Sequence, residues 1–385
     1  MRTPPLSRHE KNRNSSIELL RIIAMFMILE SHFVIHNDYD FSQIPIGFER
    51  FFLVVFMADA GKIGVVVFFT ISAWFLIDKE VALYSSLKRL WILEREVLFY
   101  SIILGVVYYC TDLIGTKVLA KSFLPLLTNT WWYVSAYALF LVFLPFVLSG
   151  LRLLGKEKHL SLAVISLILL GVLRYIPGFP AADDSYATFI LLFIVISAYK
   201  WYFKPLNIVK SVLCIIIGIC FMILRFSVFD AAYMFSGFNK PDAFGQVYVF
   251  PVLMVGFGLF SLFNQMTFHS KVVNRIAKSA FAVYLITDYP ASEQLLWGRL
   301  FDLEHLYQYS FAIIKMLIIL FCIYLICTVV DFMRQFIFAF SIDRNPGHLF
   351  DIFTNSIVSC RPYMRLRRFI LSAMRDSMER TNRSL

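Results

Sequence analysis

Ionisable residues lie within one apolar stretch near the N-terminus, residues 17–36, with the sequence IELLRIIAMFMILESHFVIH. They include Glu18, Arg21, Glu30 and His32. The stretch is long enough to cross a bilayer as a helix, and a spanning helix that keeps charged groups usually directs them to a protein interior or a wet cavity. Ten residues separate Arg21 from His32, so the two lie on one helix face, within about 20° of each other and roughly 16 Å apart along the axis.

This spacing places a fixed cation near one membrane surface and a titratable imidazole nearer the other. A guanidinium binds phosphate through two parallel hydrogen bonds, and an imidazole can take the proton of a hydroxyl that is to act as a nucleophile. Arg21 and His32 thus offer an anion-binding group and a titratable base on one helix face. The structural alternative is a snorkelling arginine and a histidine that only hydrogen-bonds a neighbouring helix.

Two further residues of the stretch are candidates for the same chemistry. Glu30 is two residues from His32 and therefore does not face it on a helix; it either orients another group or pairs with a basic residue of a neighbouring span. His36 lies one turn beyond His32, near the same face, and is the second candidate for the catalytic imidazole.

The elements that must position these residues are membrane helices. Of the 385 residues, 59% are hydrophobic, and the mean hydropathy is +0.72, which excludes an ordinary soluble domain. Apolar windows of span length recur along the whole chain and predict an all-α, polytopic membrane protein. The ten expected spans are residues 17–36, 61–78, 91–110, 131–149, 160–176, 186–202, 211–228, 246–263, 279–296 and 309–331.

Charge is distributed unequally between the expected loops. One set of loops and both terminal segments are rich in Lys and Arg, whereas the other set carries mainly Asp and Glu. The positive-inside rule then predicts a multi-pass protein of the plasma membrane with both termini in the cytoplasm. The net charge of +10 is explained by this orientation, so nucleic acid is not expected as a partner. The six cysteines are too scattered for a metal or disulfide framework, and no metal is expected.

Two segments lie outside this pattern of spans. The chain divides into a transmembrane domain, residues 1–335, and a tail, residues 336–385. The tail contains the sequence RPYMRLRRFILSAMR, which is typical of a basic amphipathic helix on the anionic cytoplasmic leaflet. The outer loop 111–130 contains the apolar run KVLAKSFLPLLTNTWWYVSAY, which either dips into the membrane or lies at its interface.

Several stretches, taken in chain order, resemble the acyltransferase-3 family of bacterial membrane acyltransferases. The first matches the family's pattern of a basic residue, ten residues and a histidine. The later ones resemble the second span, the basic turn with the third span, the fourth span and the ninth span. These stretches are NSSIELLRIIAMFMILESHF, GKIGVVVFFTISAWFLI, KRLWILEREVLFYSIIL, WWYVSAYALFLVFLPFVL and VNRIAKSAFAVYLITDYP.

The resemblance implies a membrane O-acyltransferase that moves an acyl group, usually acetyl from cytoplasmic acetyl-CoA, to a hydroxyl of a cell-surface or lipid-linked glycan. It places Arg21 and His32 at the first-helix motif positions and Lys88 and Arg89 at the basic turn that meets the donor's phosphates. We therefore expect acyl-CoA, a glycan and the lipid bilayer as partners, with His32, Glu30 and Asp288 as the catalytic group.

The chain departs from the family's pattern at several positions. Family members often have a polar residue where Val66 stands, a second histidine at Ser31 and a glycine at Ala73. In the ninth span the family's histidine is replaced by Thr287, which is followed by Asp288. A threonine can hydrogen-bond but cannot carry a proton at neutral pH. Asp288 is too short to snorkel far, and its expected partners are Arg225, Arg174 or His32.

Two other functions are compatible with these observations. A transporter or flippase-like carrier would also have a polar central cavity, although its usual internal repeat is not evident in this sequence. A catalytically silent scaffold of the same fold would tolerate the departures at Val66 and Thr287.

Overall fold

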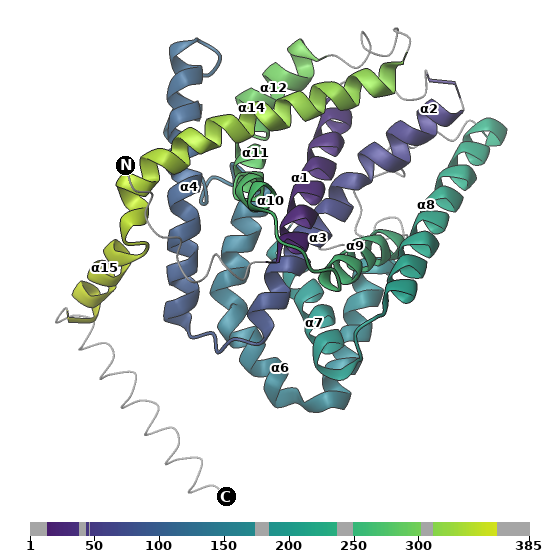
Figure 1. Ribbon diagram of the computed structural model, residues 1–385, viewed down its shortest axis with the longest axis horizontal. Helices are drawn as coiled ribbons and strands as arrows, with labels where there is room; N and C mark the ends of the chain where they lie inside the picture. Colours follow the sequence, from purple (N-terminus) through teal and green to yellow (C-terminus); the bar gives the residue numbers. More distant parts are fainter. Residues whose placement is uncertain are drawn as a thin grey trace, which may run out of the picture.

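The computed structural model describes residues 14–37, 44–45, 47–173, 185–236, 249–301 and 311–359, and all regular elements within them are helices (Figure 1). The long helices are α1 (Ser15–Ile35), α3 (Ala60–Ile77), α4 (Leu83–Cys110), α6 (Trp132–Gly171), α7 (Tyr186–Tyr202), α8 (Ile208–Ser236), α9 (Phe250–Asn264) and α14 (Ala312–Phe340). The short helices are α2 (Phe48–Phe51), α5 (Thr116–Lys121), α10 (Lys271–Ala277), α11 (Ala280–Thr287), α12 (Pro290–Leu295) and α15 (His348–Ser359). Two π-helical segments, Phe52–Ala58 and Leu296–Leu300, and a 3₁₀ turn, Ile342–Arg344, complete the elements.

The helix α1 lies at the centre of the bundle (Figure 1). It packs against α3, α9, α10, α11 and α14 and against the π-helical segment Phe52–Ala58. Because it is enclosed on so many sides, its polar side chains face protein or cavity rather than lipid, as the cost of charge in hydrocarbon requires. Its start is fixed by Asn14, whose side chain accepts a hydrogen bond from the backbone N–H of Ser16.

Burial separates inner helices from lipid-facing ones. The apolar window of α3 is 78% buried, whereas the corresponding windows of α8 and α14 are 22% and 33% buried. An apolar helix that leaves most of its surface uncovered requires an apolar solvent, which is the lipid bilayer. The chain is therefore a membrane protein in which α3 and α1 form the core and α8 and α14 lie at the periphery.

Each expected span overlaps at least one described helix, but the number ten is not confirmed. Within the described residues, four helices have both the length and the composition of a membrane span: Ala60–Ile77, Trp132–Val172, Ile208–Val228 and Ala312–Phe340. The helices α7 and α9 are apolar but shorter. By length, α1 and α4 also suffice, at 21 and 28 residues, but each carries several charged side chains, which lower its hydropathy. The expected tail falls outside the described residues from residue 360 onward.

The expected fourth and fifth spans are the two arms of α6. Gly155 interrupts this helix with φ 74 and ψ 169, a conformation that only glycine adopts without strain, and α6 turns back on itself there (Figure 1). The second arm carries the buried His159, whose Nδ1 lies 3.3 Å from the hydroxyl of Tyr202 on α7.

The expected ninth span, residues 279–296, is broken in the middle. Pro290 begins α12 and disfavours helical backbone at the preceding residue, so Tyr289 is extended with φ -68 and ψ 134. The helix α11 consequently ends at Thr287, and Asp288 becomes its C-cap residue, with its backbone N–H donating to the carbonyl of Tyr284. The break places a carboxylate in the bundle interior at a helix end.

The helices α1 and α3 approach each other closely because glycines lie at their contact. A Cβ at Gly61 would collide with the side chain of Ser31, and a Cβ at Gly64 would collide with the carbonyl oxygen of Ala24. Small residues at a helix contact allow such an approach in membranes, where close van der Waals packing drives association. Ser31 also donates a hydrogen bond of 2.8 Å to the carbonyl of Ala58.

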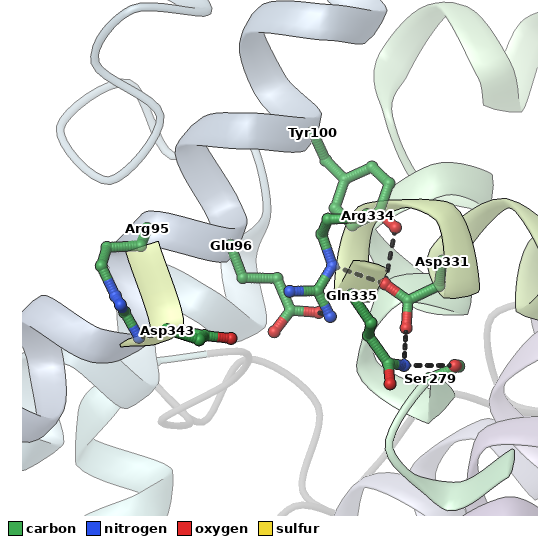
Figure 2. Close-up of polar contacts among 8 residues, drawn as sticks. All are labelled: Arg95, Glu96, Tyr100, Ser279, Asp331, Arg334, Gln335 and Asp343. Atoms are coloured by element: carbon green, nitrogen blue, oxygen red, sulfur yellow. Dashed lines mark hydrogen bonds and ion pairs between the residues drawn. The ribbon is translucent and has the colours of Figure 1, made fainter. Parts of the chain in front are cut away.

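A buried polar network, drawn in Figure 2, joins α14 to α4 and to the start of α11. Asp331 is its centre and accepts hydrogen bonds from Tyr100 at 2.7 Å, Arg334 at 2.6 Å and Gln335 at 2.6 Å. Arg334 also lies 3.2 Å from the carboxylate of Glu96 on α4. Every charge in the cluster has an opposite charge beside it, which is the condition under which charged groups persist at membrane depth.

The same network fixes the position of α11. Gln335 donates a hydrogen bond of 2.9 Å to the hydroxyl of Ser279, the residue before the first turn of this helix. The other end of α11 carries Asp288. Since α11 is a single short helix, an anchor at its start fixes where this carboxylate lies.

Candidate functional site

The bundle contains a cavity of about 280 Å³ beside the C-terminal half of α1. The helix α1 contributes one wall, α3 a second, and the segment from Asp288 to Glu293 a third. Its polar lining consists of Ser31, His32, His36, Lys62, Asn129, Thr130, Asp288 and Glu293. Asn129 and Thr130 belong to the loop before α6, so this part of the loop contacts the cavity, and Trp132 completes the lining beside them.

His32 and Asp288 lie together in this cavity. His32 Nδ1 is 3.1 Å from Asp288 Oδ1, and 14% and 11% of the two side chains are exposed. The sequence allowed three partners for Asp288, and the structure places His32 beside it. Arg225 instead pairs with Asp59, with the charged atoms 2.5 Å apart. Arg174 lies outside the described residues. The ring N–H of His32 is not aligned with the carboxylate as in a hydrogen bond, so the contact is close but not linear.

A second histidine–carboxylate pair lies beside the first. His36 Nδ1 is 2.9 Å from Glu293 Oε1, and the rings of His36 and His32 meet edge to face with centroids 5.2 Å apart. Because the two histidines are four residues apart on α1, both rings project toward the same side of the helix. The cavity therefore contains two imidazoles and two carboxylates in direct contact.

A narrow apolar recess continues from the inner side of His32. It has a volume of about 20 Å³ and is lined by Met25, Ile28, Val65, Phe68, Trp132, Tyr133, Phe281 and Tyr284 together with His32. His32 lines both the cavity and this recess, so it lies at the boundary between them. Arg21, Met25, Ile28 and His32 follow one another along a single face of α1 at helical spacing.

Two of the three expected donor-binding residues lie toward the same tyrosine. Tyr137, on α6, is within electrostatic range of both Arg21 and Arg89. Arg21 also lies 3.7 Å from Glu18 in the first turns of α1. The Nη1 atom of Arg89 is buried and has no hydrogen-bond partner among the described residues. A buried guanidinium nitrogen without an acceptor is costly unless an anion binds there.

Lys88, the third of these residues, faces a different element. Its ammonium lies 2.7 Å from Asp351 on α15, and Tyr84 donates a hydrogen bond to the same carboxylate. The Lys88 ammonium and the Tyr84 hydroxyl lower the pKa of Asp351 below its usual value of 3.8. The structure thus separates Lys88 from Arg89, because adjacent residues on a helix point about 100° apart.

Glu30 is the expected catalytic residue that the cavity does not contain. It is partly buried on α1, but it lines neither the cavity nor the recess around His32. Its position two residues from His32 turns it to another side of the helix. The geometry therefore gives Glu30 no contact with the proposed reacting groups.

The departures from the family's pattern leave the cavity lining intact. Val66 is 2% exposed and packs against Gly256 of α9, while its neighbour Val65 faces the cavity. Thr287 is buried and donates to the carbonyl of Val283, so its hydroxyl is used within α11. Asp288, one residue later, provides the group that contacts His32.

Several residues of the site were missed at the sequence level, among them Asn129 and Thr130 of the loop before α6. Lys62, Trp132 and Glu293 line the cavity, and the Lys62 ammonium lies 5.0 Å from the centre of the Trp132 ring. Lys62 lies at the start of one expected span and Glu293 lies inside another. Both could have been chosen from the sequence, because ionisable residues within spans are functional candidates. Trp132 had no such signal, since tryptophans are common at membrane interfaces.

A membrane protein whose described elements are all helical, with a partly buried histidine–carboxylate pair between a cavity and an apolar recess, is suited to an integral-membrane enzyme. A family model described as an acyltransferase domain, Acyl_transf_3, matches residues 14–332, which is most of the chain. The chain belongs to the acyltransferase-3 family and is a membrane acyltransferase. No curated protein and no solved structure matches it.

Proposed function

We propose that the protein transfers an acetyl group from cytoplasmic acetyl-CoA to a hydroxyl of a cell-surface or lipid-linked glycan in the plasma membrane. The observation that carries this proposal is the position of His32 between the outer polar cavity and the inner apolar recess. A donor can reach the imidazole from one side and an acceptor from the other.

The donor side is supported by charge and shape. Arg21 and Arg89 lie toward Tyr137, and a buried nitrogen of Arg89 has no acceptor among the described residues, which suits the phosphates of a coenzyme A molecule. Along α1, Arg21 is roughly 16 Å from His32. The extended arm of the donor would pass Met25 and Ile28 and present its thioester at His32.

The acceptor side is supported by the lining of the outer cavity. Trp132 offers an apolar ring face, while Asn129, Thr130 and Lys62 offer hydrogen-bonding groups. A sugar presents both apolar C–H faces and hydroxyls, so a cavity with these groups fits a glycan better than an apolar acceptor. A few convergent polar side chains within a partly apolar lining are typical of a binding site that orients its substrate.

The proposed reaction needs one base and no net proton. His32 takes the proton of the acceptor hydroxyl as the hydroxyl oxygen attacks the thioester carbonyl. The tetrahedral intermediate that forms then expels the coenzyme A thiolate. The imidazolium returns the proton to this thiolate, so the products are an ester and a free thiol. Asp288, 3.1 Å from His32, stabilises the imidazolium that forms between these steps. No step requires a metal.

The experiment is transfer of radiolabelled acetyl from acetyl-CoA to envelope glycans extracted from the host cell, with purified protein in lipid nanodiscs. Wild type should label the glycan through an alkali-labile ester, and His32→Gln should lose about 10²–10⁴ in rate while its melting temperature stays close to wild type. His159→Gln is the matched control, because this histidine is buried on α6 away from the cavity. It should lower stability but keep the rate per folded molecule.

Two results would count against the proposal. Near-normal labelling by the His32→Gln variant would show that the His32 imidazole is not the general base of the reaction. Folded wild-type protein that neither labels the glycan nor releases coenzyme A would remove the acetyl-transfer function itself.

A further inference from the structure

Two histidines and an aspartate in the outer cavity form a set of potential metal ligands. One donor atom from each of His32, His36 and Asp288 lies within 4.8 Å of the other two. The histidines are four residues apart on α1, a spacing that places two imidazoles on one helix face toward a single ion. The carboxylate comes from the end of α11, so the three ligands converge from two separate elements.

Their chemistry selects a class of ion. Two imidazole nitrogens and one carboxylate oxygen suit a divalent transition metal such as Zn²⁺ or Co²⁺, whereas Mg²⁺ and Ca²⁺ prefer all-oxygen ligands. A three-residue site leaves a fourth coordination position, and here the cavity of about 280 Å³ provides room for a water molecule in that position.

The geometry requires a small adjustment of side chains. Zinc–ligand distances of about 2.0–2.2 Å imply ligand atoms roughly 3.3 Å apart in a tetrahedron. His32 Nδ1 and Asp288 Oδ1 are already 3.1 Å apart, close to the separation that two ligands of one zinc ion need. His36 offers a ring nitrogen within 4.8 Å of the other two ligand atoms, a separation that side-chain rotation must shorten to about 3.3 Å.

A fourth residue orients the site from behind. Glu293 lies 2.9 Å from His36 Nδ1, and a carboxylate on one ring nitrogen directs the other nitrogen toward a metal and makes it more basic. Lys62 also lines the cavity, and its ammonium opposes a cation there. The cavity thus contains two carboxylates against one lysine, a balance that favours a divalent cation.

We propose that His32, His36 and Asp288 form a binding site for a divalent transition metal ion of the zinc class, and that the bound ion inhibits acetyl transfer. An ion on His32 Nδ1 leaves the ring proton on Nε2, so the imidazole has no lone pair with which to accept a proton, and this regulation rests on the proposed function of His32. Transfer itself proceeds without metal, and added zinc stops it reversibly.

The binding half of the proposal is tested without any activity measurement. Purified, chelator-treated protein in detergent is titrated with CoCl₂, and the visible absorption of protein-bound Co²⁺ is recorded. Wild type should give a saturable absorption band that ZnCl₂ abolishes. His36→Gln and Asp288→Asn should weaken Co²⁺ binding by at least about tenfold, and Glu293→Gln by about 10–100-fold. His159→Gln, outside the cavity, is the matched control and should bind like wild type.

The inhibitory half is tested by acetyl transfer with and without ZnCl₂, each variant being compared with its own metal-free rate. Wild type and His159→Gln should be inhibited and should recover when a chelator is added, whereas His36→Gln should need at least about ten times more zinc. Absence of the Co²⁺ band, or unchanged binding in His36→Gln, overturns the site. Binding without inhibition of an active enzyme overturns the regulation. If no acetyl transfer occurs at all, the proposed function fails, and the Co²⁺ titration alone decides whether the site exists.

Discussion

Lys88 Nζ lies 2.7 Å from Asp351 Oδ2, so the first turns of α4 are joined directly to the helix α15. Tyr84 donates to the same carboxylate, and the rings of Tyr84 and Trp91 lie 5.4 and 6.0 Å from that of Phe350. A charged residue that the sequence assigned to the donor's phosphates thus holds a C-terminal element in place. Arg89, next to it in the chain, has the buried nitrogen without an acceptor.

This division predicts unequal effects of two neighbouring substitutions on donor binding. Arg89→Gln should weaken binding of acetyl-CoA by about tenfold, because a charge-assisted hydrogen bond to phosphate contributes roughly 1.5–3 kcal/mol. Lys88→Gln should change it by less than about twofold. Isothermal titration of the purified proteins at one ionic strength measures both. Equal losses of acetyl-CoA affinity in the two variants would show that Lys88 also binds the donor.

The contact between α4 and α15 should persist at neutral pH and fail in acid. Lys88 and Tyr84 lower the pKa of Asp351 below 3.8, so the folded state favours the carboxylate. Because the pKa of Asp351 is lowered on folding, the contact contributes its full stability at pH values above the ordinary pKa of 3.8. This contribution is lost as the pH falls through the lowered pKa. Spin labels at Ser85 and Ser356, in a cysteine-free background, should give one narrow distance distribution at pH 7 and a broad one once the pH falls well below 3.8.

A substitution at neutral pH provides the control for this titration. Asp351→Asn should give the broad distribution at pH 7, because the uncharged amide no longer holds the Lys88 ammonium. A narrow distribution in this variant would mean that the aromatic contacts to Phe350 suffice to hold α15.

Asp288 should affect the rate of transfer more than donor binding. Asp288→Asn keeps the shape of the side chain but removes the charge that stabilises the His32 imidazolium, and the turnover rate should fall by about 10²-fold or more. The KM for acetyl-CoA should stay within about twofold. Thr287→Val is the matched control, because the Thr287 hydroxyl is bonded within α11 to Val283. An unchanged turnover rate in Asp288→Asn would contradict this role.

The ion pair between Asp59 and Arg225 should matter for stability. The two side chains are 1% and 9% exposed and their charged atoms lie 2.5 Å apart. Removing one partner leaves an uncompensated buried charge, so Asp59→Asn or Arg225→Gln should each destabilise the protein by about 3–5 kcal/mol. The double variant should be more stable than the sum of the two losses predicts. Thermal melts in one detergent measure this, and strictly additive losses would show that the residues act independently.

The orientation in the membrane should follow the loop charges. Reporter fusions at Gly150 and Lys210 should report cytoplasm, and a fusion at Asp183 should report the outside, because basic loops stay on the cytoplasmic side. A reversed result at any two of these positions would invert the assignment of donor and acceptor sides.

The sequence determined the features that depend on local composition. Apolar windows identified membrane helices, and the spacing of Arg21 and His32 placed both on one face of α1, because helical geometry alone fixes that relation. Pro290 and Gly155 likewise act through local backbone restrictions, which break the ninth expected span and fold α6 into two arms. The ordered family stretches also indicated the family that the comparison established.

Only the tertiary structure decided which side chains meet. Asp288 had several possible partners in sequence and contacts His32 because the end of α11 faces α1, while Arg225 pairs with Asp59. Lys88 and Arg89 are adjacent in the chain yet face different elements, and Lys62 and Glu293 enter the cavity from helices far from His32 in sequence. The physical reason is that periodicity defines the face of a helix, whereas the packing of neighbouring helices determines what that face contacts.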